Sequence, residues 1–428
     1  MTIAPRNSGS GGTPGPLWPL MLPSSKQGLD SMCAVSAHGV RVRFADGQEC
    51  LAGTSGLWNA NLGFGNVAIA EAAAAALRDA SYLSVWGYEN AYARQAAAEL
   101  VDVAGADRFA RVLFATSGGS ANDMAMKLVR HVHVLRGEAR RRGIVGLRDG
   151  YHGLTYGAFA LTDARLGHEM YGVDRRLVGH VPANDPDALS ALLDRADGRI
   201  AAMVVEPVIG TAAVPLTDEY VAAVLDLRRE HGFLLVADEV STGFGRIGTA
   251  LFASSVWPEQ PDILITAKGL TNGTMAAAAV LVSHEVAAAF IEGDAILGHA
   301  ETQAGTPVAC AAISAMISEM ARLDAVAASA RLGRRLDSLL ARLEDEIDIV
   351  TATTGAGCLR AVRLGDDDRP LPQEEVPAVV AAIRDAGALV HPGPSCIQLL
   401  PALIYADDDL NALMRCVTEG IAAHGRRR

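Results

Sequence analysis

The chain has 428 residues, of which half are hydrophobic and a fifth are charged, a balance typical of a globular protein with a large buried core. Its 37 basic and 49 acidic side chains leave a formal net charge of −12. This charge argues against a nucleic-acid partner, because nucleic-acid-binding surfaces are basic. No apolar run reaches the length of a membrane span, so no membrane partner is expected either.

The six cysteines are scattered along the chain and form no CxxC pair. No histidine stands at zinc-binding spacing from them, so we expect reduced thiols, a cytoplasmic protein and no metal site. Residues 1–30 begin with a stretch rich in glycine, serine and proline and lack the charged-then-apolar order of a secretory signal. They predict a flexible N-terminal tail or arm.

The elements expected next along the chain indicate two kinds of architecture. Residues 31–70 resemble a hairpin with Asp46-Gly47 at its turn. Between about 100 and 285, short apolar runs alternate with helical patterns, which predicts an α/β fold with a mainly parallel sheet covered by helices. The apolar runs expected to form strands are 111–115, 143–147, 201–205, 233–237 and 263–266.

The helices expected within this region include 121–139 and the segment after Thr217, which is a plausible N-cap with Gly232 beyond the helix end. Helical patterns at 323–345 and 407–425 flank a short strand-like stretch and predict a smaller α+β lobe. We therefore expect a large domain over 76–322. The small domain is expected to be built from both chain ends, 31–75 and 323–428.

Ligands of open parallel sheets bind at the carboxyl ends of the strands, so the residues after each apolar run are the candidate site. Ser117, Gly118 and Gly119 stand between a strand and a helix start, where free N–H groups and the helix dipole suit a phosphate. The same residues also fit a tight turn capped by Ser120. From this segment alone, a phosphate site and a capped turn are equally good interpretations.

Asp238 and Glu206 each follow a run of apolar residues. A carboxylate there either caps the next segment or is a buried anion that requires a cationic partner, because unpaired burial costs several kcal/mol. Tyr151 and His152 either pack on the core or lie against a planar cofactor ring. The residues GFGRIG at 243–248 match a dinucleotide-binding pattern, but no convincing helix follows them, which argues against a nicotinamide-dependent oxidoreductase.

The chain contains 34 arginines but only three lysines. Lys26 lies near the N-terminal tail and Lys127 lies in the middle of an expected helix, where a solvated lysine is ordinary. Lys268 follows an apolar run, and an amine desolvated there has a lowered pKa that suits Schiff-base chemistry. If one lysine forms an imine, Lys268 is the candidate by elimination.

Six motifs in this order resemble the class III, omega-type aminotransferases, which use pyridoxal 5′-phosphate (PLP) on a fold-type-I scaffold. They are TSGGSANDMAMKLVR, GYHG, VVEPVIG, LLVADEVSTGFGRIG, ILITAKGL and HAETQAGTPVACAA. The resemblance extends from about Gly39 to the C-terminal helix. It implies an α/β fold of PLP fold type I and a homodimer with shared active sites.

The resemblance also implies a role for each matching residue. Lys268 carries the cofactor as a Schiff base, and Asp238 bonds the ring nitrogen so that the ring accepts electrons. The other residues expected to bind the cofactor are Ser117, Gly118, Gly119, Tyr151, His152, Glu206, Val240 and Thr302. Thr302 is expected to reach the phosphate of the neighbouring subunit. On the substrate side the resemblance implies Trp58, in the GLW motif, and Trp86.

Three positions depart from the family pattern. Gly119 stands where relatives often have a second serine, and Ser241 stands where many have glutamine. His391, in GALVHPG, aligns with a segment where omega-type enzymes often carry an arginine for the substrate α-carboxylate. Another arginine, such as Arg246, is an alternative source of that contact. Loss of the arginine favours an acceptor without an α-carboxylate.

The expected activity is transfer of an amino group from a small-molecule donor to a ketone or aldehyde. Residues 16–23, PLWPLMLP, and the altered motifs resemble aminotransferases of daptide-type natural-product biosynthesis, which aminate a ketone at the C-terminus of a ribosomally made peptide. The alternative is a small-molecule omega-amino acid or diamine transaminase acting with a keto acid. A PLP aminomutase is a further alternative.

Overall fold

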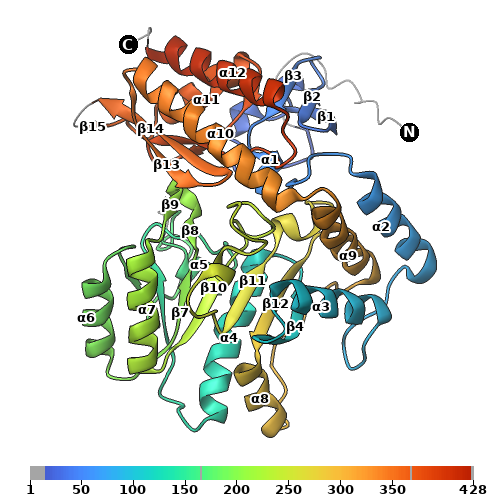
Figure 1. Ribbon diagram of the computed structural model, residues 1–428, viewed down its shortest axis with the longest axis vertical. Helices are drawn as coiled ribbons and strands as arrows, with labels where there is room; N and C mark the ends of the chain where they lie inside the picture. Colours follow the sequence, from blue (N-terminus) through green and yellow to red (C-terminus); the bar gives the residue numbers. More distant parts are fainter. Residues whose placement is uncertain (1–14, 164–165, 367–368, 426–428) are drawn as a thin grey trace.

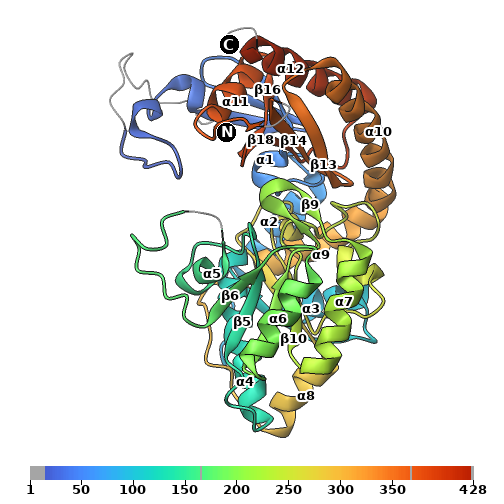
Figure 2. The same ribbon diagram turned by 90° about the vertical axis from the view of Figure 1, so that its left-hand side faces the viewer.

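The computed structural model describes residues 15–163, 166–366 and 369–425. The residues form two lobes stacked along the long axis of the molecule, as Figures 1 and 2 show. The first half of the expected N-terminal tail, 1–14, lies outside the described residues. No helix in the described ranges is long and apolar enough to cross a membrane.

The lower lobe in Figure 1 is built on a seven-stranded sheet. Its strands, in spatial order, are β4 (Phe109–Ala115), β12 (Ala278–Ser283), β11 (Ile263–Thr266), β10 (Leu234–Asp238), β7 (Ile200–Val205), β5 (Gly143–Leu147) and β6 (Val178–Val181). Only β12 runs antiparallel to its neighbours, β11 and β4. All five strands expected from apolar runs form, and β6 and β12 are additions.

Helices cover both faces of this sheet because its central strands are apolar on both sides. Val236 and Ile265 pack in one core with α4 (Gly118–Leu135) and α8 (His284–Glu292). The adjacent side chains, Leu235 and Leu264, point to the opposite face. The helices on that face are α3 (Ala91–Ala104), α6 (Pro186–Ala196), α7 (Asp218–His231) and α9 (Pro307–Arg322). The mixed α/β fold with a mostly parallel, helix-covered sheet is therefore confirmed.

The upper lobe contains two smaller sheets and three helices. One sheet consists of β13 (Val350–Ala356), β14 (Leu359–Asp366), β18 (Cys396–Leu399) and β17 (His391–Gly393), with β15 (Arg369–Pro370) beside β14. The other consists of β1 (Ala34–His38), β2 (Arg41–Phe44), β3 (Glu49–Ala52) and β16 (Ala388–Leu389). The helices are α10 (Ala325–Glu346), α11 (Val376–Asp385) and α12 (Asp407–Gly425). Leu51 pairs with Ala388, so segments from both chain ends share one sheet.

Local signals explain several element boundaries. The Thr217 hydroxyl accepts a hydrogen bond from Tyr220 N and caps α7, while Gly232 ends it with φ +68°. Gly47, with φ +91°, turns the chain between β2 and β3 as the hairpin pattern predicted. The helix expected at 121–139 forms at Gly118–Leu135, so both of its ends are shifted toward the N-terminus. Its C-terminal end lies two residues before Gly137, which has φ +77°.

Short elements connect these layers. They are the helices α1 (Ser55–Trp58), α2 (Val67–Ala80) and α5 (Tyr156–Leu161), the strands β8 (Val208–Ile209) and β9 (Val214–Pro215), and the 3₁₀ turns η1 (Ser24–Lys26), η2 (Asp30–Met32), η3 (Gly210–Ala212), η4 (Ala253–Val256) and η5 (Lys268–Thr271). Several of them contribute to the site: Thr155, just before α5, and Lys268, at the start of η5, line it, and α1 ends with Trp58 beside it.

Candidate active site

A cavity of about 670 Å³ lies where β4, β5, β10 and β11 reach their carboxyl ends. This volume is in the range of small-molecule sites. The segments after these four strands come together there, as expected for an open parallel sheet. The predicted site residues that line the cavity are Ser117, Gly118, Gly119, Tyr151, His152, Asp238, Val240 and Lys268.

One wall of the cavity is the N-terminus of α4. The Ser117 hydroxyl accepts a hydrogen bond from Ser120 N at 3.1 Å, so the tight turn forms but Ser117, not Ser120, caps the helix. A Cβ on Gly118 would lie 3.1 Å from both methyl groups of Val240. A side chain at 118 would therefore press on Val240, and only glycine keeps this cradle open.

The carboxylate of Asp238 lies at the end of β10 and is almost completely buried. Its Oδ2 lies 2.7 Å from His152 Nδ1 and accepts a hydrogen bond of 2.8 Å from Asn122 Nδ2. Burial opposes ionisation, but these hydrogen bonds and the one from Val240 N outweigh it and lower the pKa of Asp238. The site thus holds a preformed buried anion.

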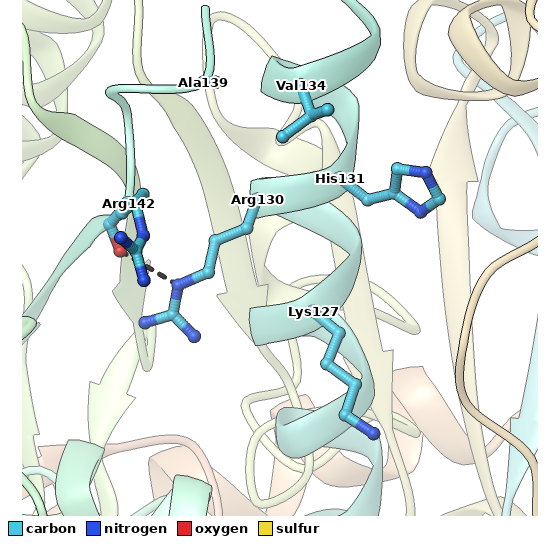
Figure 3. A pocket seen from close by; sticks show the side chains of 6 residues that line it. All are labelled: Lys127, Arg130, His131, Val134, Ala139 and Arg142. Atoms are coloured by element: carbon cyan, nitrogen blue, oxygen red, sulfur yellow. Dashed lines mark hydrogen bonds between the residues drawn. The ribbon is translucent and has the colours of Figure 1, made fainter.

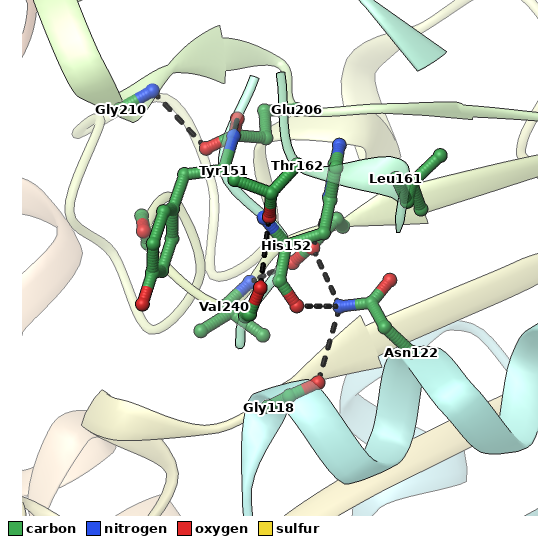
Figure 4. Close-up of polar contacts among 12 residues, drawn as sticks. Gly118, Asn122, Tyr151, His152, Leu161, Thr162, Glu206, Gly210 and Val240 are labelled. Atoms are coloured by element: carbon green, nitrogen blue, oxygen red, sulfur yellow. Dashed lines mark hydrogen bonds and ion pairs between the residues drawn. The ribbon is translucent and has the colours of Figure 1, made fainter. Parts of the chain in front are cut away.

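His152 lines the cavity, and Glu206 lies next to it, bonded to the backbone of Tyr151. Burial disfavours the imidazolium, but the hydrogen bond and charge of Asp238 outweigh burial and raise the pKa of His152. Glu206 accepts hydrogen bonds from the backbone N–H groups of Tyr151 and Gly210, at 3.0 and 3.1 Å (Figure 4). Burial raises the pKa of Glu206 despite these contacts. Glu206 therefore fixes the backbone that carries the half-exposed Tyr151 ring.

Lys268 stands at the start of η5 in a left-handed backbone conformation, with φ +41°. Its Nζ donates a hydrogen bond of 2.7 Å to Ser241 Oγ. Burial lowers the pKa of Lys268 to about 8, although Asp238 and Glu206 pull it the other way. A buried amine with this pKa is available as a nucleophile and as a proton carrier near neutral pH.

Two of the predicted substrate residues lie together beside this amine. The Trp58 ring centre is 4.6 Å from Lys268 Nζ, and its edge contacts the His391 ring at a centroid distance of 5.7 Å. A Cβ on Gly210 would lie 2.9 Å from the Trp58 ring, so the indole packs directly on the backbone there. Burial, and then the Lys268 charge, lower the pKa of His391.

Trp86 and Thr302 do not line the cavity of the single chain. Trp86 lies between α2 and α3 with 73% of its surface exposed, and Thr302 is also exposed. Their segments contact each other, because the Tyr82 hydroxyl donates a hydrogen bond of 2.9 Å to Thr302 O and Asn90 Nδ2 donates one of 2.9 Å to Gly305 O. Both residues thus share one exposed surface.

The other lysines lie elsewhere. Lys26 is exposed in η1, and Lys127 is exposed on α4, where its Nζ is 3.3 Å from Gly298 O. Lys127 borders a separate hollow on the outer side of α4, together with Arg130, His131, Val134, Ala139 and Arg142 (Figure 3). Of the three lysines, only Lys268 is partly buried, and only its amine is influenced by the charges of Asp238 and Glu206.

Arg246 is not free to bind a substrate carboxylate. It is fully buried, and its guanidinium donates hydrogen bonds to Pro401 O and Asn61 Oδ1. Burial lowers its pKa to about 10. No arginine lines the cavity in the part of the chain that the structure describes. The GFGRIG segment around Arg246 continues into turns rather than a helix, unlike a dinucleotide-binding motif.

Sequence reasoning missed several polar residues at the site, and three of them matter for its chemistry. Asn122, in the first turns of α4, donates a hydrogen bond to Asp238. Nothing in the sequence indicates this role, because polar residues are common within helices. Glu301 accepts hydrogen bonds from Thr116 and Ser120 beside the cradle. Thr155 lines the cavity from the start of α5. Ser241 was noted only as a departure from a family pattern.

These residues fit PLP. The glycine cradle suits a phosphate, Asp238 offers a buried anion to a ring nitrogen, and Lys268 offers an amine with a lowered pKa. Bound PLP supplies an electron sink that allows an amino group to pass from one substrate to another. With the cofactor bound, an amine at this position would be the group to take the proton from the substrate carbon and to return it.

Comparisons with known proteins agree with a site for PLP. The family described as Aminotransferase class-III matches residues 24–421. An uncharacterized aminotransferase, YhxA, of Bacillus subtilis is 30% identical over 91% of this chain and 92% of its own. The omega-aminotransferase of Caulobacter vibrioides is 29% identical over 89% of this chain and 91% of its own. The acetylornithine aminotransferase of Mycolicibacterium smegmatis is 32% identical over 90% and 93%.

Among solved structures, an amine transaminase from an uncultivated Pseudomonas species, in a PLP-bound form, superposes with a TM-score of 0.90. It is 28% identical, and the match covers 96% of this chain and all of that protein. The fold is thus that of PLP fold type I transaminases. The chain belongs to the class III aminotransferase family and is a PLP-dependent transaminase.

Proposed function

We propose that this transaminase aminates a ketone or aldehyde acceptor that carries no α-carboxylate. The observation that supports this proposal is the lack of any arginine among the described residues that line the cavity. Arg246, which is buried, is held by Asn61 and Pro401. A carboxylate is best bound by a permanently charged guanidinium fork, and no such fork faces this cavity.

His391 does not replace that fork. The imidazole lies against Trp58, and its pKa is lowered by burial and by the Lys268 charge, so it is neutral near pH 7. A neutral imidazole offers a carboxylate one hydrogen bond at most. An acceptor with an α-carboxylate would lose the charge-assisted pair, which is worth about 1.5–3 kcal/mol. A ketone without an α-carboxylate has no such pair, so its binding is not weakened by the missing arginine.

The finer form of the proposal is a peptide ketone as the acceptor, with a small-molecule amino donor. It rests on the resemblance of residues 16–23 to daptide-type enzymes, and this segment leaves apolar side chains exposed. They are Leu17, Trp18, Leu20 and Met21. The names of the relatives, omega-aminotransferase and acetylornithine aminotransferase, favour the alternative of a small-molecule transaminase.

We further propose the predicted homodimer and the predicted site roles. The loop between α2 and α3 exposes five large apolar side chains beside Thr302, an arrangement typical of a surface that a partner covers. They are Tyr82, Leu83, Val85, Trp86 and Tyr88. In this dimer Thr302 and Trp86 complete the neighbouring site. The domain division at 31–75, 76–322 and 323–428 stays part of the proposal.

All six cysteines are free thiols in the structure, which supports a reducing, cytoplasmic setting as part of the same proposal. Within the site, the proposed cofactor contacts come from Ser117, Gly118, Gly119, Tyr151, His152, Glu206, Asp238, Val240 and Lys268.

The acceptor is tested by kcat/KM for pyruvate, for a methyl ketone of similar size and for a peptide with a C-terminal ketone. We expect the wild type to favour a ketone over pyruvate. The variant His391→Arg should gain about 10- to 100-fold with pyruvate and little with the methyl ketone. A wild type that prefers pyruvate, with no effect of the arginine, would refute the proposal. A peptide no better than the methyl ketone would remove its finer form.

A further inference from the structure

The phosphate cradle at the start of α4 has few hydroxyl groups of its own. Gly118 and Gly119 form its centre and carry no side chains. Three hydroxyl residues flank them, Thr116, Ser117 and Ser120. A phosphate dianion is usually bound by several donors, including hydroxyl groups, so the direction of each hydroxyl decides the strength of the site.

Two of the three hydroxyls are committed elsewhere. Thr116 Oγ1 and Ser120 Oγ both donate hydrogen bonds to the carboxylate of Glu301, which also accepts one of 3.0 Å from Thr116 N. Burial opposes ionisation of Glu301, but these hydrogen bonds outweigh it and lower its pKa, so Glu301 stays charged and keeps both hydroxyls. Only Ser117 has a hydroxyl proton left for a ligand.

Thr155 offers a hydroxyl at the same place from another element. It lines the cavity, and a Cβ on Gly119 would lie 3.4 Å from Thr155 Oγ1 and 3.6 Å from Thr155 Cγ2. The residue precedes α5, but its side chain makes no capping hydrogen bond. Nor does its hydroxyl bond any other group in the described ranges.

The position of Thr155 relative to the cradle is fixed by backbone contacts. Ala158 N, in the first turn of α5, donates a hydrogen bond of 2.6 Å to Asp123 Oδ1 on α4. Gly157 approaches the same carboxylate so closely that a Cβ there would overlap it. Because α5 is tied to α4 in this way, the Thr155 hydroxyl is held beside Gly119 before any ligand binds.

We propose that the Thr155 hydroxyl donates a hydrogen bond to the phosphate of PLP and supplies the donor that the side chain at position 119 lacks. The proposal rests on the placement of that phosphate at Gly118 and Gly119. The proposal gives the Thr155 hydroxyl a role in cofactor binding. The start of α5 does not need this hydroxyl, because it makes no capping hydrogen bond.

The test is the affinity of the apoenzyme for PLP, measured by titration of cofactor absorbance. Thr155→Val keeps the shape and removes the hydroxyl, and Thr155→Ser keeps the hydroxyl. We expect about 10- to 100-fold weaker PLP binding for the valine variant and near-normal binding for the serine variant. Pyridoxal, which has no phosphate, should bind equally to all three proteins. The melting temperature of the apoenzyme should be unchanged by the valine, because no capping bond is lost.

A second variant tests the position of the missing donor. Gly119→Ser has room for its Cβ and should restore PLP binding when it is combined with Thr155→Val. Unchanged PLP affinity in Thr155→Val would overturn the proposal, and so would an equal loss for pyridoxal. If Gly118→Ala still weakens PLP binding in that case, the phosphate placement stands and only the role of Thr155 falls.

Discussion

The Nζ of Lys268 lies 4.6 Å from the centre of the Trp58 ring. The same amine donates a hydrogen bond to Ser241, and no ion pair joins it to a carboxylate in the described part of the chain. An aromatic face and one hydroxyl replace water only in part, so burial prevails and lowers the pKa to about 8. Burial of the amine, and not the Trp58 contact, therefore sets the pH at which the amine can react.

The first prediction concerns pH. Below pH 8 most of Lys268 is an ammonium ion without a free electron pair, and the fraction of free amine rises about tenfold per pH unit. The rate at which the apoenzyme captures PLP covalently should therefore rise with pH and level off above about 8. Stopped-flow absorbance would measure it. A midpoint near 10.5, the value of a solvated lysine, would contradict the burial argument.

The second prediction concerns the covalent anchor. Borohydride reduction followed by peptide mapping should place the cofactor on Lys268, because this amine is buried beside the cavity. Lys268→Ala should bind PLP without a covalent bond and lose transamination. Lys127→Ala is the matched control and should behave as the wild type, since its exposed amine contacts Gly298 O. Cofactor found on Lys127 would overturn the site assignment.

The third prediction concerns the buried anion. Asp238→Asn keeps the shape of the carboxylate but removes the charge that His152 and Asn122 hold in place. Loss of a preorganised charge in a dry site typically lowers the rate by about 10²–10⁴. Single-turnover rates should be compared at saturating PLP, with cofactor occupancy checked by absorbance. An unchanged rate at full occupancy would show that Asp238 only supports the fold.

The fourth prediction compares two glycines of the cradle. Gly118→Ala places a methyl group 3.1 Å from Val240 and should push that side chain into the cavity, whereas the methyl group of Gly119→Ala meets Thr155 at an ordinary 3.4 Å. Overpacking of this kind costs about 1–3 kcal/mol. We expect PLP affinity to fall by about 5- to 150-fold in the first variant and by less than about threefold in the second. Equal effects would mean that Val240 moves freely.

Much of the sheet followed from the sequence because buried parallel strands are continuous apolar runs. Leu234–Asp238 is apolar up to Asp238, and Ile263–Thr266 is apolar up to its last residue, Thr266. β12 was missed because its alanine-rich sequence is also typical of a helix, and only pairing with β11 and β4 selects the extended form. β6 was missed because Gly179 and His180 interrupt its apolar run.

The site was predicted where its residues follow strands and missed where they come from other elements. Asp238 and Lys268 stand at strand ends, so the order of the chain places them. Asn122, Glu301 and Thr155 reach the same region from a helix, a loop and a helix start, and their roles depend on tertiary contacts. The left-handed backbone of Lys268 is likewise imposed by its surroundings rather than by residue type.

The last prediction concerns the sharing of sites in the proposed dimer. Thr302 is exposed in the single chain, yet its backbone is held by Tyr82, so its side chain is positioned to reach outward. Thr302→Val should weaken PLP binding by about 10- to 100-fold if its hydroxyl donates to a phosphate. Co-expression of Thr302→Val and Lys268→Ala chains with different tags yields a mixed dimer. The PLP affinity of this dimer depends on whether Thr302 contacts the cofactor of its own chain or that of the neighbouring chain.

If Thr302 serves the neighbouring site, the Thr302→Val subunit contributes its own Lys268 and receives an intact threonine from its partner. One site of the mixed dimer is then complete, and Lys268 should be labelled by borohydride at wild-type PLP concentrations. If Thr302 serves its own chain, that site keeps the valine and requires 10- to 100-fold more PLP, as in the Thr302→Val homodimer. Labelling at limiting PLP distinguishes the two cases without any measurement of transamination, and a mixed dimer no better than the homodimer would exclude the shared site.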